Sequence, residues 1–98
     1  MLIRVFRAKP KPGRDEELAR LIQAVSIPFV DRQPGVVGRF SGRGIGAAGD
    51  EIVMISIWDD LESMKRMTGE DWETGVIPDE RLAERIDSCS VAHYQTFE

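Results

Sequence analysis

Residues 51–58 read EIVMISIW, and this stretch decides the fold. In a strand, the even-numbered residues from Ile52 to Trp58 point to one face and the odd-numbered ones from Val53 to Ile57 to the other. Both faces are therefore apolar, whereas a strand with one face in water alternates apolar with polar residues. The stretch predicts a strand that is covered on both sides.

On either side of this strand, the sequence predicts further strands at residues 2–8, 36–45 and 90–97. Each is rich in β-branched or aromatic side chains, and proline or glycine interrupts or bounds the first two. A first helix is expected after Gly13, with acidic residues in its first turn, an end or kink at Pro28, and an apolar stripe made of Leu18, Leu21, Ile22 and Val25.

A second helix is expected to start at Asp59, because Asp59 and Glu62 have the spacing of a capping box, and to end at Gly69. A short third helix is expected to start at Pro78 and to turn Leu82 and Ile86 inward. The order β-α-β-β-α-β predicts an α+β domain of the ferredoxin-like type with an antiparallel sheet, spanning residues 1–98 as a single domain.

The second face of the sheet needs a cover that the chain does not supply. Right-handed crossovers put both helical segments on the same side of the sheet. An apolar face left in water forfeits several kcal/mol at roughly 25 cal/mol per Å². A second copy packed face to face solves this, so we expect a homodimer, although a second face that is polar on the first, second and fourth strands would permit a monomer.

Composition excludes several classes of protein. The 98 residues carry a net charge of −4 with no basic block, which argues against binding to nucleic acid or to an anionic membrane. The amino-terminal residues contain charges where a signal peptide is apolar, and no apolar stretch is long enough to span a bilayer. We expect a cytoplasmic protein, and Cys89, the only cysteine, excludes an internal disulfide.

These features resemble the antibiotic biosynthesis monooxygenase family. The likeness rests on the order of elements, on Trp58-Asp59-Asp60 at the end of the third strand, and on Gly69-Glu70-Asp71-Trp72-Glu73 followed by Val76-Ile77-Pro78. It covers nearly the whole chain and implies a dimeric α+β barrel. The family includes oxygenases that act on phenolic or quinol-like substrates without metal or flavin, and also enzymes that degrade haem.

The resemblance disfavours haem degradation. That branch of the family uses an asparagine on the first strand, a tryptophan at the end of the third and a histidine on the following helix. Trp58 matches the tryptophan, but Phe6 stands at the asparagine position and residues 61–86 contain no histidine.

His93, the only histidine, is the candidate general base, because it is the one side chain whose ordinary pKa lies near neutrality. The competing interpretation is a packed or exposed histidine without a catalytic role. Trp58 and Trp72 are candidates for an aromatic wall of a substrate pocket, or for ordinary packing, and residues 72–75 for a lid. Phe6 and Arg39 complete the set of expected substrate-binding residues.

Arg4 and Arg43 compete with Arg39 for the role of a cation that holds an oxyanion, since all three fall within predicted strands. The string GIGAAG at residues 44–49 matches a dinucleotide fingerprint, but a strand follows it instead of a helix, so we interpret it as a hairpin connection. With one histidine and one cysteine, we predict no metal site and no cofactor.

Three functions fit this pattern. The first is cofactor-independent monooxygenation of a small phenolic, quinol-like or polyketide-type aromatic, in which the deprotonated substrate itself reduces oxygen. The second is a non-enzymatic dimer that binds a small hydrophobic molecule, for example in a stress response. The third is isomerisation or cyclisation of an aromatic polyketide.

Overall fold

The sheet is antiparallel throughout, with the strand order β2-β3-β1-β4. β1 (Leu2–Pro10) and β3 (Ile52–Trp58) form its centre, and β2 (Val36–Arg43) and β4 (Ile86–Gln95) form its edges. This computed structural model, which describes residues 1–97, confirms the α+β class and the ferredoxin-like order expected from the sequence.

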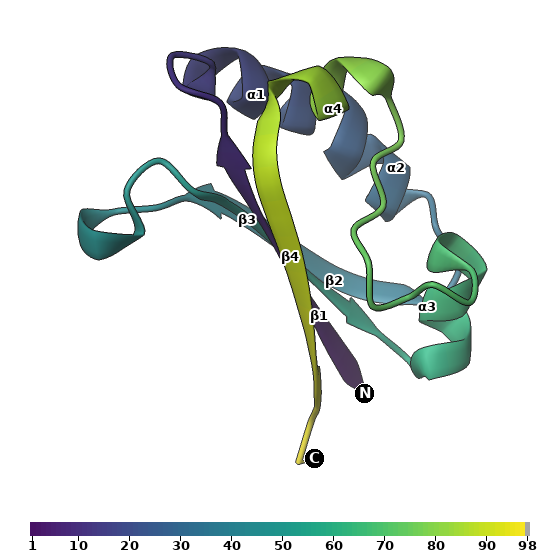
Figure 1. The fold of residues 1–98 in the computed structure, drawn as a ribbon. Coiled ribbons are helices and arrows are strands. Elements are labelled where there is room, and N and C mark those ends of the chain that lie inside the picture. The colour runs from purple at the N-terminus through teal and green to yellow at the C-terminus, as the bar shows by residue number, and fades with distance from the viewer. Residues whose placement is uncertain (98) are drawn as a thin grey trace.

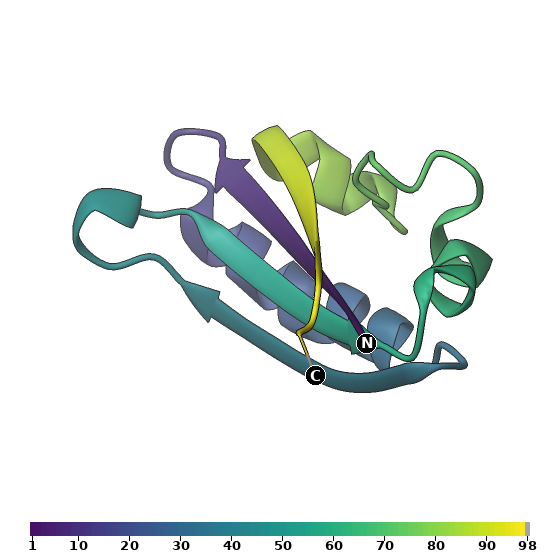
Figure 2. The ribbon, with the colours of Figure 1, turned by 90° about the horizontal axis from the view of Figure 1, so that it is seen from below.

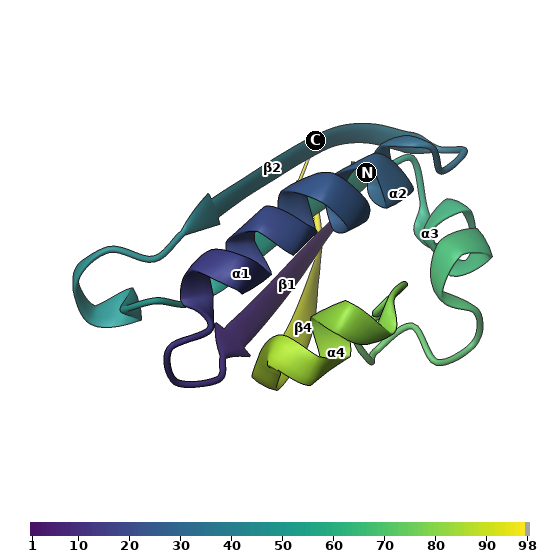
Figure 3. The ribbon, with the colours of Figure 1, turned by 90° about the horizontal axis from the view of Figure 1, so that it is seen from above.

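Most of the helices lie over one face of the sheet, while the helix that follows β3 lies beside the end of the sheet, as Figures 1 and 3 show. The helices are α1 (Asp15–Leu21), the π-helix η1 (Ile22–Ser26), α2 (Ile27–Asp31), α3 (Leu61–Thr68) and α4 (Glu80–Arg85). A short 3₁₀ turn, η2 (Gly46–Ala48), caps the hairpin between β2 and β3, which projects beyond the sheet (Figure 1). The GIGAAG string is therefore a hairpin connection, as predicted.

The alternation in β3 is confirmed. Ile52, Met54, Ser56 and Trp58 are buried, and the three residues between them are half-buried. The buried set packs against the helices, where Leu18, Met64 and Leu82 have almost no exposed surface. Figure 2 shows the opposite face of the sheet, over which no helix of the described residues lies.

Pro28 does not end the first helix, so that part of the expectation is wrong. The chain widens into η1 before the proline and continues as α2 to Asp31. Pro28 then occupies the first turn of a new α-helical segment, the part of a helix that tolerates proline best.

The second and third helices start later than predicted. α3 is capped by Asp60, not Asp59, because the Asp60 carboxylate accepts a hydrogen bond from the Ser63 backbone N–H at 2.8 Å. α4 is likewise capped by Asp79 and begins at Glu80, two positions after Pro78.

Strand ends also differ from the prediction. β2 ends at Arg43 instead of Ile45, where the backbone N–H of Gly44 bonds to Glu51 and closes the hairpin. β4 begins at Ile86 instead of Ser90, since pairing with β1 extends as far as Pro10. Ile86 is therefore a strand residue rather than the last inward residue of a helix.

Gly35 lies close to α3, and a Gly35→Ala variant should be strongly destabilised. Its φ is +86°, and an added Cβ would lie 2.5 Å from the Ser63 Cβ. The left-handed backbone and the collision together should lower the free energy of unfolding by about 2–4 kcal/mol, measured by urea denaturation.

Gly13→Ala is the matched control for this prediction. Gly13 also has a positive φ, of +78°, but nothing lies within 4 Å of the position that an added methyl group would take. Its replacement should lower stability by only about 1 kcal/mol. Equal losses in the two variants would show that the contact with Ser63 is unimportant.

Candidate functional site

A row of polar residues crosses the helix-covered face of the sheet. Arg39 of β2 pairs with Ser56 of β3, Ser56 with Arg4 of β1, and Arg4 with His93 of β4. Side chains directly opposite each other in antiparallel strands point to the same face. The register thus brings together four residues, called here the polar row, from four separate parts of the sequence.

Arg4 is the buried member of the polar row, with 3% of its surface exposed. Its Nη1 donates to the Trp72 carbonyl at 2.6 Å, and its Nη2 donates to the Thr74 carbonyl at 2.9 Å. Within residues 1–97, no carboxylate forms an ion pair with Arg4. Burial lowers the pKa of Arg4 to about 10, so the guanidinium still carries its charge at neutral pH.

His93 contacts Arg4 through its ring. The Arg4 Nη1 lies 2.9 Å from His93 Nε2, and since arginine can only donate, Nε2 carries the lone pair. Burial lowers the pKa of His93, and the Arg4 charge adds to this effect while Glu73 opposes it. The imidazole is therefore neutral at pH 7, and it packs edge-on against Trp72 with ring centroids 4.8 Å apart.

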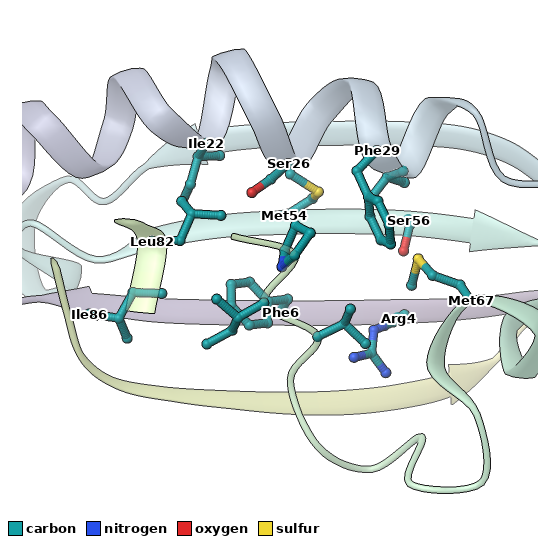
Figure 4. A pocket seen from close by; sticks show the side chains of 14 residues that line it. Arg4, Phe6, Ile22, Ser26, Phe29, Met54, Ser56, Met67, Leu82 and Ile86 are labelled. Atoms are coloured by element: carbon teal, nitrogen blue, oxygen red, sulfur yellow. The ribbon is translucent and has the colours of Figure 1, made fainter. Parts of the chain in front are cut away.

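Beside the polar row lies a cavity of about 50 Å³ between the sheet and the helices. Figure 4 shows Phe6 and Met54 projecting from the sheet, Ile22 and Phe29 from the helices, and Arg4 with Ser56 and Met67 toward one end. Three lining residues are polar, namely Arg4, Ser26 and Ser56; the others are apolar, comprising Phe6, Ile22, Phe29, Val30, Met54, Met67, Val76, Ile77, Pro78, Leu82 and Ile86.

Residues 72–78, here named the covering segment, lie in the connection between α3 and α4. They form one wall of the cavity. Trp72 and Thr74 accept the hydrogen bonds of Arg4, while Val76, Ile77 and Pro78 line the cavity. Gly75 permits this close approach, since a Cβ there would lie 2.9 Å from the Phe6 ring. The Arg4 side chain therefore fixes the covering segment as well as one wall of the cavity.

The five expected site residues lie in four different settings. Phe6 lines the cavity, whereas His93 and Trp72 contact Arg4. Trp58 has no exposed surface, and its indole N–H donates to the Ser56 hydroxyl at 2.9 Å, so it belongs to the core and holds Ser56. Arg39 pairs with Asp31 at 3.0 Å near the molecular surface.

Sequence reasoning did not select Arg4 over the other arginines, and it missed Ser26 and Ser56 altogether. A signal for Ser56 was present, because it is the one polar residue on the buried face of EIVMISIW. Arg4 has the same signal in β1, where Leu2 and Ala8 share its face. For Ser26 we find none, since its place depends on the π-helical turn of η1.

Two further features concern residues 1–97. This part of the chain contains no group of three or more histidine, cysteine, aspartate or glutamate side chains that could hold a metal ion. None of its helices has the length and apolar character needed to cross a membrane.

Comparison with known proteins gives one family and many similar structures. The family model described as "Antibiotic biosynthesis monooxygenase" matches residues 1–71. The covering segment and all the residues after it, His93 included, thus lie beyond the matched residues. None of the curated proteins matches the chain significantly in sequence.

Three similar solved structures illustrate the fold. SnoaB from Streptomyces nogalater, described as a cofactor-independent oxygenase, is 18% identical, with a TM-score of 0.73 over 99% of this chain and 93% of that one. A conserved protein from Methanosarcina mazei Go1 is 20% identical, with a TM-score of 0.72 over 97% and 92% of the two chains. Rv0793 from Mycobacterium tuberculosis is 15% identical, with a TM-score of 0.72 over 99% and 95%.

Proposed function

The chain belongs to the antibiotic biosynthesis monooxygenase family, and we propose that it oxygenates a small phenolic, quinol-like or polyketide-type aromatic without metal or flavin. The observation that carries this proposal is the apolar cavity whose polar wall holds a buried, charged Arg4 in contact with a neutral His93. The similarity to SnoaB, a cofactor-independent oxygenase, supports it at low identity.

The chemistry needs only a substrate that loses a proton easily. The resulting carbanion or phenolate passes electrons to oxygen one at a time. One oxygen atom then becomes a carbonyl on a ring carbon that was a CH₂ group. The other leaves as water with the two hydrogens of that carbon. The protein supplies a dry apolar site, a base such as His93 and a cation that stabilises the oxyanion.

A His93→Ala variant tests the role of the base. Oxygen uptake with a panel of hydroquinones and naphthols should fall roughly 10²- to 10⁴-fold, while ligand affinity changes little. Because the pKa of His93 is lowered from its ordinary 6.5, the histidine is unprotonated at neutral pH, and the wild-type rate should decline only at more acidic pH.

Tyr94→Phe is the control for this variant. Tyr94 follows His93 in β4 and so points to the opposite face, where loss of its hydroxyl should leave oxygen uptake unchanged. Absence of uptake with every substrate of the panel, in a folded wild-type protein, would exclude the oxygenase.

The second candidate function is binding without turnover. It is favoured by one observation, that His93 Nε2 is already engaged by Arg4, so a ligand would compete for it. In that case the cavity retains its ligand, oxygen uptake is absent, and His93→Ala does not impair binding.

We further propose that the working form is a homodimer, joined through the sheet face that the helices leave open. Ile55 and Val5 are neighbours at the centre of that face, and Phe40 and Tyr94 are exposed on its outer strands. A second copy of the chain would cover these apolar side chains. The cytoplasmic location remains a prediction from the sequence.

A further inference from the structure

Two N–H groups of the Arg4 guanidinium donate no hydrogen bond to the described residues. A guanidinium carries five N–H groups, and Arg4 uses three of them, for Trp72, Thr74 and His93. Within residues 1–97, the Nε–H and the second hydrogen of Nη2 have no acceptor. An Nε–H and an Nη2–H can together form the edge of the planar guanidinium that binds two oxygens of an acid or two lone pairs of one oxyanion.

The positive charge of Arg4 also has no counter-charge beside it. Its three acceptors are two carbonyls and a neutral imidazole, so no negative charge faces it from β1, β4 or the covering segment. Glu73, the one acidic group that influences His93, is exposed on the covering segment. A buried cation without a counter-charge is unfavourable, and an anion in the cavity would relieve it.

The rest of the cavity suits an apolar body. Phe6 and Met54 line it from the sheet and Ile22 from η1, while Ser56, next to Arg4 in the polar row, offers a hydroxyl. That hydroxyl oxygen already accepts from Trp58, which leaves its hydrogen free to donate. At about 50 Å³, the cavity is smaller than the roughly 150 Å³ apolar cavity that holds benzene, so an aromatic ring enters only when the covering segment moves.

We propose that the ligand of this cavity is a small hydrophobic acid, bound as its anion, with the anionic oxygen on the free edge of Arg4 and the apolar body against Phe6 and Met54. The inference rests on the proposed function in taking the same cavity as the substrate site, but it does not depend on turnover. Arg4 is then the residue that selects acidic ligands, whether the anionic oxygen belongs to a phenol, an enol or a carboxylic acid.

4-Nitrophenol is a direct probe, because it ionises near neutral pH and only its anion absorbs visible light strongly. Bound next to Arg4, its pKa should fall by roughly 1–3 units, as for an acid beside a buried cation. The expected result is a saturable rise in absorbance when wild-type protein is added at a pH just below the pKa of the free phenol. Failure to bind, or ionisation like that of free 4-nitrophenol, overturns the proposal.

Variants assign the effect to Arg4. Arg4→Met should abolish the absorbance shift, and Arg4→Lys should retain part of it, because lysine keeps the charge but loses the two-donor edge. Arg39→Met is the matched control, since Arg39 belongs to the polar row but is already paired with Asp31, and it should leave the shift unchanged. Circular dichroism and thermal melting identify any variant that does not fold, and the wild-type titration stands without them.

A second pair of ligands separates the sources of the anionic oxygen. Calorimetry should show benzoate binding about tenfold or more tightly than benzamide, a neutral molecule of the same shape. A phenol-selective site would bind 4-nitrophenol with a lowered pKa and ignore benzoate, which would narrow the acid to phenols and enols. Equal affinity for benzoate and benzamide, without any shift of 4-nitrophenol, contradicts an anion site.

Ligand binding and oxygen uptake together distinguish failure of this anion site from failure of the proposed oxygenase. An anion site with no oxygen uptake supports this inference and leaves the protein as a binder of small acids. Oxygen uptake that survives Arg4→Met undiminished, in a folded variant, supports the oxygenase and overturns the role of Arg4.

Discussion

A Phe40→Glu variant should be monomeric at micromolar concentrations at which we expect the wild type to form the proposed dimer. Phe40 is 65% exposed, and its neighbours across the sheet on the same face are Ile55, then Val5, then Ala92. A two-fold axis places the substituted residue in the interface twice, so two carboxylates would be buried without partners. We expect the dissociation constant to rise roughly a thousandfold or more, as several kcal/mol of uncompensated burial implies.

Native mass spectrometry measures this change, with light scattering as a check in solution. The protomer should remain folded, because Phe40 contributes little to the core. Ala83→Glu is the control: it adds the same charge at an exposed site on α4, on the other side of the sheet, and should leave the dimer intact. A wild type that is monomeric would refute the face-to-face pairing, as would a Phe40→Glu variant that still dimerises.

Trp58→Ala should severely lower the stability of the protein. Trp58 has no exposed surface, and its indole N–H holds the Ser56 hydroxyl. Truncating a fully buried tryptophan lowers the free energy of unfolding by about 3–5 kcal/mol, a large share of the roughly 5–15 kcal/mol of a typical domain. For a chain of 98 residues, the melting temperature should fall by roughly 15–30 °C, measured at fixed protein concentration.

Trp72→Ala is the matched comparison. It removes the same side chain from a half-buried position, where the ring packs against His93, so the loss of stability should be clearly smaller. Its effect should fall instead on the covering segment and on Arg4, and thus on the binding of 4-nitrophenol. Similar melting temperatures for the two variants would contradict a core position for Trp58.

Boundaries of elements show where reasoning from local sequence failed. Asp59 and Asp60 are both good capping residues, and the choice of Asp60 coincides with a bond from the Asp59 backbone to Gly35, remote in sequence. Residues 86–89 contain Asp87 and Ser88, which are weak strand formers, yet they extend β4 because β1 offers them a pairing edge. Tertiary contacts outweighed local preference in both places.

The sequence by itself determined the α+β class, the order of elements and the two faces of β3. These depend on the period-two alternation of a strand and on breaks at glycine and proline, which are properties of neighbouring residues. The same alternation put Ser56 on one face with Ile52, Met54 and Trp58, but it did not place Arg4 or His93 beside them.

Only the tertiary structure decided which arginine lies at the cavity. Arg4 and Arg39 occupy the same face and the same polar row, but Arg39 is on an edge strand and reaches Asp31, whereas Arg4 is on a central strand under the covering segment. The pair formed by Arg4 and His93 joins residues 89 positions apart. Such a contact depends on the strand order and register of the whole sheet, which no stretch of neighbouring residues encodes.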